Sequence, residues 1–352
     1  MNRFEYVRAT STAGAIAAVA DPGAVYLAAG TNLLDLMKGR ITQPTRLVDI
    51  TRLPGLDKIE RLPDGGARIG ALVRNSDLAH DPDFARRFPA VAEALLSGAS
   101  AQLRNAATTA GNLMQRTRCH YFYDTASACN KRDPGAGCDA RGGDTRLHAV
   151  LGWSEHCVAT HPSDFCVPLV AFDAVVEIEG KSGRREIALE DFHRLPGTEP
   201  WHETVLDSGE LIVAVRLPPD AGDFAGHARY LKVRERSSYA FAVVSAAAGL
   251  RLDGQCIADA RLALGGVALK PWRAREAERL LVGREPNKTA FHEAAQAALA
   301  EAKPSGDNAF KIELARRIVV RALSLAAAGT PQLLPALPGS PFALTAGVAT
   351  DA

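Results

Sequence analysis

Short apolar runs and helical patterns alternate along the first hundred residues of the chain. Residues 13–20 are rich in alanine, follow Ser11 and Thr12, which are favourable helix N-caps, and stop before Pro22. Residues 24–29 form a continuous apolar run of strand length. The pattern predicts helices at 13–20, 33–38 and 75–100, strands at 24–29 and 46–50, and a hairpin at 58–71.

The pattern changes in the second half of the chain, where strands come first and helices follow. A hairpin is predicted at 174–189 and a strand at 211–217, and the prolines at 218 and 219 indicate a domain boundary near residue 222. Strands within 229–269 then precede helices at 273–282, 288–302 and 308–328, an order typical of an α+β domain. Prolines in 331–352 predict an extended tail.

Between these regular parts, residues 115–165 show no sustained period. A loop of this length inside a compact protein is usually functional or disordered. Its aromatic residues, among them Phe122 and Trp153, argue against disorder. Five of the six cysteines of the chain fall in or next to this segment: Cys119, Cys129, Cys138, Cys157 and Cys166.

Composition excludes several classes of function. The chain has 352 residues, 41 basic and 40 acidic, with a net charge of +1, so it lacks the one-sign field that steers binding to nucleic acid or anionic membranes. It has no apolar run of the roughly 20 residues that a membrane helix needs. The N-terminus does not have the pattern of a signal peptide. We therefore expect a protein made in the cytoplasm, with two or three domains and no export signal of its own.

The cysteine spacing, C-x9-C-x8-C-x18-C from Cys119 to Cys157, matches no general metal motif. Zinc ligands usually come in C-x2-C pairs, and ferredoxin ligands lie closer together. Nearby basic residues would offset thiolate charge, and Gly135 and Gly137 would let backbone N–H groups approach sulfur. From spacing alone, a metal site and free cysteines in an irregular loop stay open as alternatives.

Two other stretches have the shape of phosphate-binding turns. Residues 27–34 pass from a strand through Gly-Thr-Asn into a helix. Residues 104–113 follow a helix and have a similar shape, with small residues, a Thr and then Gly-Asn. Neither matches the G-x-G-x-x-G fingerprint. Taken alone, the first is read as a plain strand–turn–helix, and Lys232 as part of a solvated basic strand face. We find no catalytic constellation in the sequence.

Five motifs taken in order are more specific: A-A-G-T-N-L-L-D-L-M-K, I-G-A-L-V-R-N-S-D-L, R-N-A-A-T-T-A-G-N, H-P-S-D-F and Y-L-K-V-R-E-R. Together they resemble the FAD-binding medium subunit of the molybdenum hydroxylases, the family of xanthine dehydrogenase and carbon monoxide dehydrogenase. The resemblance implies an α+β fold. A two-part FAD-binding domain of the PCMH type would span 1–222, with an inserted iron–sulfur loop at 115–165. A smaller α+β domain at 223–330 and the tail 331–352 would follow.

The resemblance also implies which residues contact FAD. Ala29 and Ala110 stand where many members have glycine, and we expect both loops to avoid positive φ there. The implied contacts are Leu27, Ala28, Ala29, Gly30, Thr31, Asn32, Leu33 and Leu34 in a diphosphate loop, Thr109, Gly111 and Asn112 in a second loop, Ser163 and Asp164 near the ribityl or diphosphate region, and Lys232 from the C-terminal domain.

The segment rich in cysteine resembles the inserted loop of the FAD subunit of bacterial periplasmic aldehyde oxidoreductase, which carries a [4Fe–4S] cluster, as does that of 4-hydroxybenzoyl-CoA reductase. The implied cluster ligands are Cys119, Cys129, Cys138 and Cys157. Cys166 lies in the stretch that resembles a flavin contact, so it is expected not to be a ligand.

The function implied by the resemblance is electron transfer within a larger aldehyde oxidoreductase. A large subunit would carry the molybdenum cofactor, and a small subunit with [2Fe–2S] clusters would pass electrons through this chain's FAD to an external acceptor. Such a complex would be cytoplasmic, or periplasmic by export with a partner subunit. The alternatives are a related molybdenum hydroxylase, an enzyme like 4-hydroxybenzoyl-CoA reductase, a stand-alone flavin oxidase, and a scaffold whose cysteines hold zinc.

Overall fold

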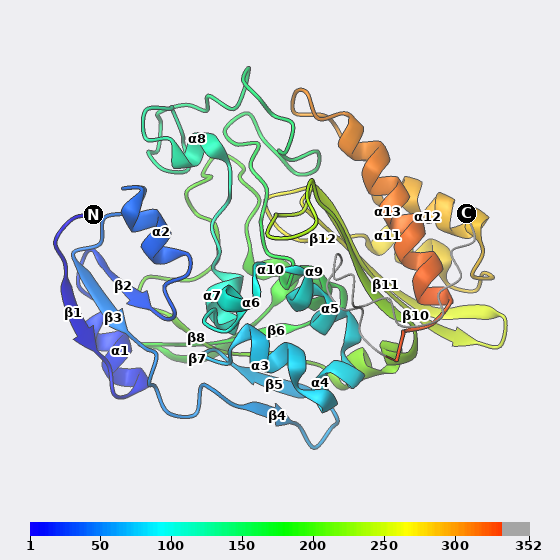
Figure 1. Cartoon of the computed structure of the whole chain (residues 1–352), viewed down its shortest axis with the longest axis horizontal. Helices are drawn as coiled ribbons and strands as arrows, with labels where there is room; N and C mark the ends of the chain where they lie inside the picture. Colours follow the sequence, from blue (N-terminus) through cyan, green and yellow to red (C-terminus); the bar gives the residue numbers. More distant parts are fainter. Residues whose placement is uncertain (333–352) are drawn as a thin grey trace.

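The computed structural model describes residues 1–332, and the predicted extended tail lies almost entirely outside them. The chain begins with a small parallel sheet of order β1-β3-β2, at the left of Figure 1. Ser11 caps its first helix by accepting a hydrogen bond from the N–H of Gly14, as its sequence predicts. The elements are β1 (Glu5–Arg8), α1 (Thr12–Ala18), β2 (Ala24–Leu27), α2 (Leu33–Lys38) and β3 (Arg46–Asp49).

A second, antiparallel sheet of order β4-β5-β8-β6-β7 forms the centre of the molecule. Its middle strand, β8, is nearly all buried and joins two hairpins that are more than a hundred residues apart in the chain. The strands are β4 (Ile59–Arg61), β5 (Ala67–Gly70), β6 (Val175–Gly180), β7 (Gly183–Ala188) and β8 (Leu211–Leu217).

The single helix predicted at 75–100 is wrong, because three short helices occupy this region. Pro82 and Pro89 each stand at the start of a helix, where a missing N–H does no harm, and each would break a helix that continued through it. The helices on this side of the sheet are α3 (Asn75–His80), α4 (Pro82–Arg87), α5 (Pro89–Ser97), α6 (Ala101–Arg104) and α7 (Thr109–Leu113).

The C-terminal part is a four-stranded antiparallel sheet of order β12-β11-β10-β9, covered by helices (Figure 1). Helix α13 lies across β9 and β10, and α5 packs against β9 from the N-terminal side. The elements are η1 (Pro219–His227), β9 (Ala228–Val233), β10 (Val244–Asp253), β11 (Cys256–Gly265), β12 (Trp272–Arg273), α11 (Arg275–Leu281), α12 (Lys288–Ala298) and α13 (Phe310–Ala327).

The segment 115–165 is irregular, as predicted, with one short helix, α8 (His120–Tyr123). It lies between the N-terminal sheet and α13 in Figure 1 and leads into α9 (Cys166–Ala171), while α10 (Leu189–Phe192) follows β7. Val150 and Leu151, near its end, are buried in the hydrophobic core of the C-terminal part. Both donate their N–H groups to the carbonyl of Val267. The segment is thus held by both halves of the chain.

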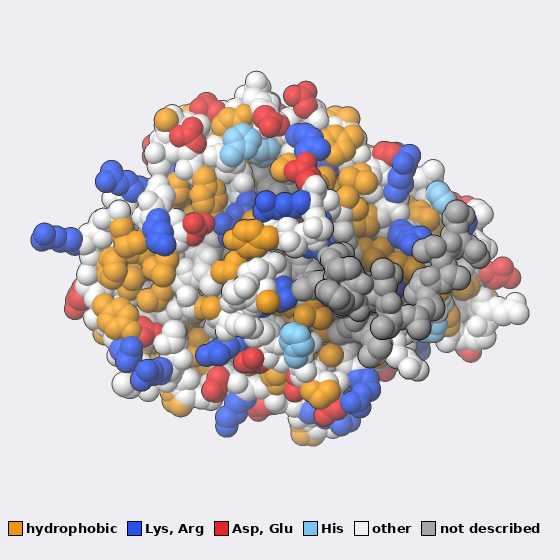
Figure 2. All heavy atoms as spheres, viewed as in Figure 1, with side chains coloured by type: hydrophobic (Ala, Val, Ile, Leu, Met, Phe, Trp, Pro, Cys, Tyr) orange, Lys and Arg blue, Asp and Glu red, His pale blue; other side chains and the backbone are white. Residues whose placement is uncertain are grey.

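The architecture confirms the predicted α+β fold of an FAD-binding part followed by a smaller α+β part. Figure 2 shows acidic and basic side chains interspersed over the visible face, in line with the small net charge. Among residues 1–332, none of the helices combines the length and apolar character that a bilayer crossing requires.

Candidate functional site

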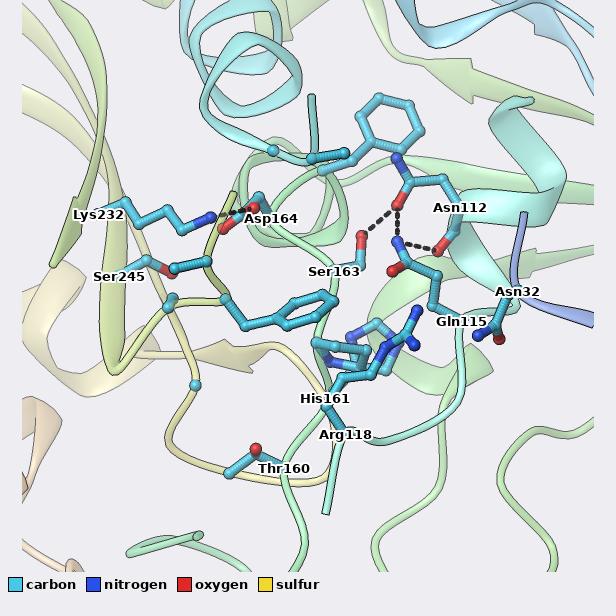
Figure 3. Close-up of a pocket in the computed structure, with 18 of the residues that line it drawn as sticks. Asn32, Asn112, Gln115, Arg118, Thr160, His161, Ser163, Asp164, Lys232 and Ser245 are labelled. Atoms are coloured by element: carbon cyan, nitrogen blue, oxygen red, sulfur yellow. Dashed lines mark hydrogen bonds and ion pairs between the residues drawn. The ribbon is translucent and has the colours of Figure 1, made fainter. Parts of the chain in front are cut away.

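A cavity of about 700 Å³ opens where the two halves of the chain meet (Figure 3). Its lining comes from the start of α2, from α5 to α7, from residues 160–165, from β9 and from the segment after β9. A volume of this size suits a large organic cofactor. The cavity is therefore the candidate site for the flavin.

About half of the predicted FAD contacts line this cavity. Those that do are Thr31, Asn32, Gly111, Asn112, Ser163, Asp164 and Lys232. Leu27, Ala28, Ala29, Gly30, Leu33, Leu34 and Thr109 are not in its lining. Of residues 27–34, only Thr31 and Asn32, in the turn, line the cavity. The strand before the turn and the helix after it hold these two residues in place. The contacts themselves stay predictions.

The backbone of these loops behaves as expected from the sequence. Gly30 has a φ of +74°, and a Cβ there would lie 2.8 Å from Cδ1 of Leu34. Ala29 and Ala110 are not among the residues with positive φ in the described chain. Only glycine adopts the turn at position 30 without strain, and this fixes where Thr31 and Asn32 enter the cavity.

A polar chain connects the second predicted loop with the H-P-S-D-F stretch. The Ser163 hydroxyl donates to Oδ1 of Asn112 at 2.8 Å, and the Gln115 amide donates to the same oxygen at 2.5 Å (Figure 3). Asn112 lies in α7 and Ser163 lies about fifty residues later, so the hydrogen bonds hold two distant segments at one wall of the cavity. The sequence did not single out Gln115.

Lys232 reaches the cavity wall but forms an ion pair with Asp164. Its Nζ lies 2.8 Å from Oδ2 of Asp164, and both side chains are almost fully buried, at 3% and 7% exposure. The Tyr230 hydroxyl donates to the other carboxylate oxygen at 2.6 Å. Burial raises the pKa of Tyr230 well above its ordinary value, and the neighbouring Asp164 adds to this. Strand β9 is thereby tied to the loop before α9.

Several buried polar atoms in this wall have no hydrogen-bond partner within residues 1–332. They include Nδ2 of Asn32, Oδ1 of Asn75, both ring nitrogens of His161, Oγ of Ser245, Nε of Arg118 and Nδ1 of His148, and all six residues line the cavity. Leaving such groups unpaired is costly. A ligand rich in donors and acceptors would satisfy them, so the cavity fits FAD.

The four predicted cluster ligands line a second, smaller cavity together with Lys131. Cys129 and Cys138 face each other across an isolated antiparallel bridge, and all six cysteines of the chain are free of disulfides. Cys119 lines both cavities, as does Thr117. The fold thus brings residues 119, 129, 138 and 157 together, whereas their spacing in the sequence left open whether they share a site.

Burial opposes ionisation of these sulfurs, whereas nearby backbone N–H groups and a lysine favour it. Burial raises the pKa of Cys119 to about 12 and that of Cys157 to about 11. Backbone N–H groups of Tyr121 and Phe122 hydrogen-bond to Cys119, and the Lys131 charge acts on Cys157, which oppose these shifts. Such N–H···S contacts and nearby charge are typical of iron–sulfur sites.

The spacing of the sulfurs argues against a single zinc ion. Four thiolates around one zinc lie about 3.8 Å apart, given Zn–S bonds of about 2.3 Å in a tetrahedron. Within residues 1–332, the one group of three or more potential ligand atoms all within 4.8 Å of one another is His161, Cys166 and His193. No three of the four cysteine sulfurs are therefore that close.

The basic residues expected near the cluster are mostly engaged elsewhere. Arg116 pairs with Glu203 at 3.0 Å, and Arg132 donates to the carbonyls of Tyr121 and Phe122 at 2.9 Å. Lys131, 3% exposed, pairs with Glu203 at 3.1 Å. Arg118, similarly, pairs with Asp35.

The glycines 135 and 137 shape the loop between two of the cysteines. The N–H of Gly137 donates to Oδ1 of Asn130 at 2.9 Å, not to a sulfur atom. Gly135 and Gly137 both have positive φ, at 89° and 99°, so their role is to turn the loop between Cys129 and Cys138.

One contact was missed by sequence reasoning. Nε2 of His148 lies 3.1 Å from Sγ of Cys119. Burial lowers the pKa of His148 to about 4, so the ring is neutral at physiological pH. The sequence showed four histidines in the segment 115–165, with no signal to separate His148 from the others.

Comparison with known proteins agrees with this geometry. Residues 2–220 match the family described as the FAD binding domain in molybdopterin dehydrogenase, and residues 229–326 match the CO dehydrogenase flavoprotein C-terminal domain. The aldehyde oxidoreductase FAD-binding subunit PaoB of Escherichia coli (strain K12) is 52% identical, over 93% of this chain and 99% of the relative. The carbon monoxide dehydrogenase medium chain of Hydrogenophaga pseudoflava is 30% identical, over 92% and 97%.

Solved structures give the same result. Carbon monoxide dehydrogenase from Hydrogenophaga pseudoflava superposes with a TM-score of 0.73 at 29% identity, covering 93% of this chain and 98% of that one. Quinoline 2-oxidoreductase from Pseudomonas putida 86 superposes with a TM-score of 0.72 at 26% identity, with the same coverage. The chain therefore belongs to the FAD-binding medium subunits of the molybdenum hydroxylases and is the flavin subunit of a multi-subunit oxidoreductase.

Proposed function

We propose that this chain is the flavin and [4Fe–4S] subunit of a molybdenum-dependent aldehyde oxidoreductase. In this proposal a small [2Fe–2S] subunit delivers electrons from a large molybdenum-cofactor subunit, and an external acceptor removes them. The similarity to an aldehyde oxidoreductase subunit across nearly the whole chain supports the substrate class. The observation that carries the cluster is the convergence of four distant cysteines on one small cavity.

FAD supplies the exchange between single-electron and two-electron chemistry in such an enzyme, and the protein supplies position and electrostatics. In this chain, Thr31 and Asn32 would hold one part of the flavin at the turn before α2. Asn112, Ser163 and the Lys232–Asp164 pair would hold another part from the opposite wall. Cys119, Cys129, Cys138 and Cys157 would hold the cluster.

Metal and flavin content of the purified complex test the proposal. For each copy of this chain we expect one FAD, no zinc and about four irons in addition to those of the small subunit's [2Fe–2S] clusters. Changing Cys129 to alanine should abolish the iron of this chain. The matched control is Cys166→Ala, which removes another buried thiol that does not line the cysteine cavity and should leave the iron unchanged.

Equal iron loss in both variants would show that the ligand set is wrong. Zinc in place of iron would favour the scaffold alternative. The substrate class is tested separately, by measuring acceptor reduction with an aldehyde, a purine and a CoA thioester in turn. Turnover with the aldehyde alone is the expected result, and turnover with another of these would reassign the enzyme within the family.

A further inference from the structure

His148 lies in the wall that separates the two cavities. Its side chain is buried, its Nε2 is 3.1 Å from Sγ of Cys119, and it lines the flavin cavity. Cys119 is the one predicted cluster ligand that lines both cavities in the described chain. The contact between the two residues is thus on the side of the cluster site that faces the flavin.

The chemistry of the contact fixes its direction. A sulfur that ligates iron is a thiolate and can only accept a hydrogen bond. Nδ1 of His148 has no hydrogen-bond partner within residues 1–332. The imidazole therefore carries its proton on Nε2 and donates it to the sulfur.

The backbone of His148 is held by the C-terminal helix. Nζ of Lys311 donates to the carbonyl of His148 at 2.8 Å, and Nδ2 of Asn308 donates to the same carbonyl at 3.0 Å. Both of these side chains belong to fully buried residues. The N–H of His148 donates to the carbonyl of Thr145 at 2.8 Å. The imidazole thus has a fixed position relative to Cys119.

We propose that His148 is a positioning residue that sets the reduction potential of the cluster through its hydrogen bond to Cys119. This inference rests on the proposed function, because it requires a cluster bound by Cys119. One-electron reduction adds one negative charge to the cluster and its thiolates. An N–H donated to a ligand sulfur stabilises the reduced form more than the oxidised form, so it raises the potential.

The test compares two substitutions in the complete holoenzyme. His148→Met puts an apolar side chain of similar size in place of the imidazole and removes the donor, whereas His148→Gln supplies an amide N–H that can reach the sulfur. The measurement is a redox titration of the cluster with dithionite, followed by electron paramagnetic resonance. A hydrogen bond to a charged group contributes about 1.5–3 kcal/mol in general. The reduction potential changes only by the difference between the strength of this bond in the reduced and in the oxidised cluster.

We expect the ratio of reduced to oxidised cluster in His148→Met to fall about tenfold at a given potential, which is about 59 mV for one electron. His148→Gln should restore most of this shift. An unchanged potential in His148→Met with full iron content would overturn the inference and leave the cluster itself in place. A wild-type enzyme with no iron beyond that of its [2Fe–2S] clusters would instead refute the proposed function.

A second measurement uses the wild-type enzyme and so does not depend on how the variants fold. With histidine labelled with ¹⁵N, pulsed electron paramagnetic resonance of the reduced cluster should show coupling to a histidine side-chain nitrogen. The coupling should disappear in His148→Gln, which identifies its source. A wild-type cluster without such coupling would overturn the proposal.

Discussion

Replacing Lys232 with methionine removes one partner of the buried ion pair at the flavin cavity. The Asp164 carboxylate, 7% exposed, would keep only the Tyr230 hydroxyl as a charge-stabilising contact. Breaking a buried pair in this way typically costs about 3–5 kcal/mol, because an uncompensated charge stays in a medium of low polarity. The Lys232 donor to the carbonyl of Ser97 at 3.2 Å is lost as well. We therefore expect a loss of about 3–5 kcal/mol in the free energy of unfolding.

The assay is urea unfolding of the chain stripped of its cofactors, followed by circular dichroism. A matched control is Arg86→Met, which breaks the exposed pair with Asp83, where the side chains are 75% and 85% exposed. That variant should change stability by less than about 1 kcal/mol.

Removing both charges tests whether the loss comes from the pair. Lys232→Met combined with Asp164→Asn should be less destabilised than the sum of the two single variants, because no unpaired charge remains buried. A loss below about 1 kcal/mol in Lys232→Met, or strict additivity in the double variant, would refute the reasoning.

Three further predictions concern other parts of the chain. Gly30→Ala should lower the free energy of unfolding by about 1–2 kcal/mol or more and weaken FAD binding, as measured by thermal melts and flavin titrations. The control is Gly55→Ala, which has a similar φ of +76° but no atom within 4 Å of its Cβ. It should show only the cost of placing alanine at a positive φ. Lys311→Met removes the donor from the carbonyls of Leu147 and Gly266 and one of the two donors from that of His148, so it should lower stability by about 3 kcal/mol or more, measured by urea unfolding; a neutral result would mean that water replaces the amine. Burial opposes ionisation of Asp49, but hydrogen bonds, chiefly from Thr51, outweigh it and lower its pKa from 3.8 to about 2. The folded state thus binds fewer protons than the unfolded state between about pH 4 and 2, so the stability that Asp49 contributes falls as the pH drops through that window. Melting temperatures measured against pH should show this fall in the wild type and a flatter profile in Asp49→Asn. Parallel profiles would contradict the lowered pKa of Asp49.

Local pattern was enough to predict most helices and strands. α2 and β8 have the predicted limits, and the N-cap of α1 follows from Ser11. The pattern was misleading at 75–100, where apolar spacing continues across Pro82 and Pro89 although the helix does not. The position of β8 between β5 and β6 was out of reach, because it depends on pairing between strands far apart in the chain.

In the candidate site, too, some residues could be predicted from the sequence, whereas others depend on contacts between distant parts of the chain. The family resemblance predicted the cysteines and part of the flavin wall, although the cysteine spacing alone matches no general metal motif. His148 has no such motif, because its contact with Cys119 depends on a loop that α13 holds in place. Likewise, Lys232 looked like a solvated strand residue until the fold placed Asp164 opposite it. Contacts of this kind become visible only in three dimensions.

The anchoring of the irregular segment by the C-terminal part has a consequence for biosynthesis. Lys311 follows His148 by 163 residues, and Val150 and Leu151 need the core of the C-terminal sheet and helices. At about 5–20 residues per second, translation takes roughly 10–30 seconds to cover that distance. During that interval the nascent chain exposes its cysteines without the helix that shapes their loop. If the proposed cluster is present, its loading would therefore follow the synthesis of α13, and a chain truncated before α13 should lack this iron.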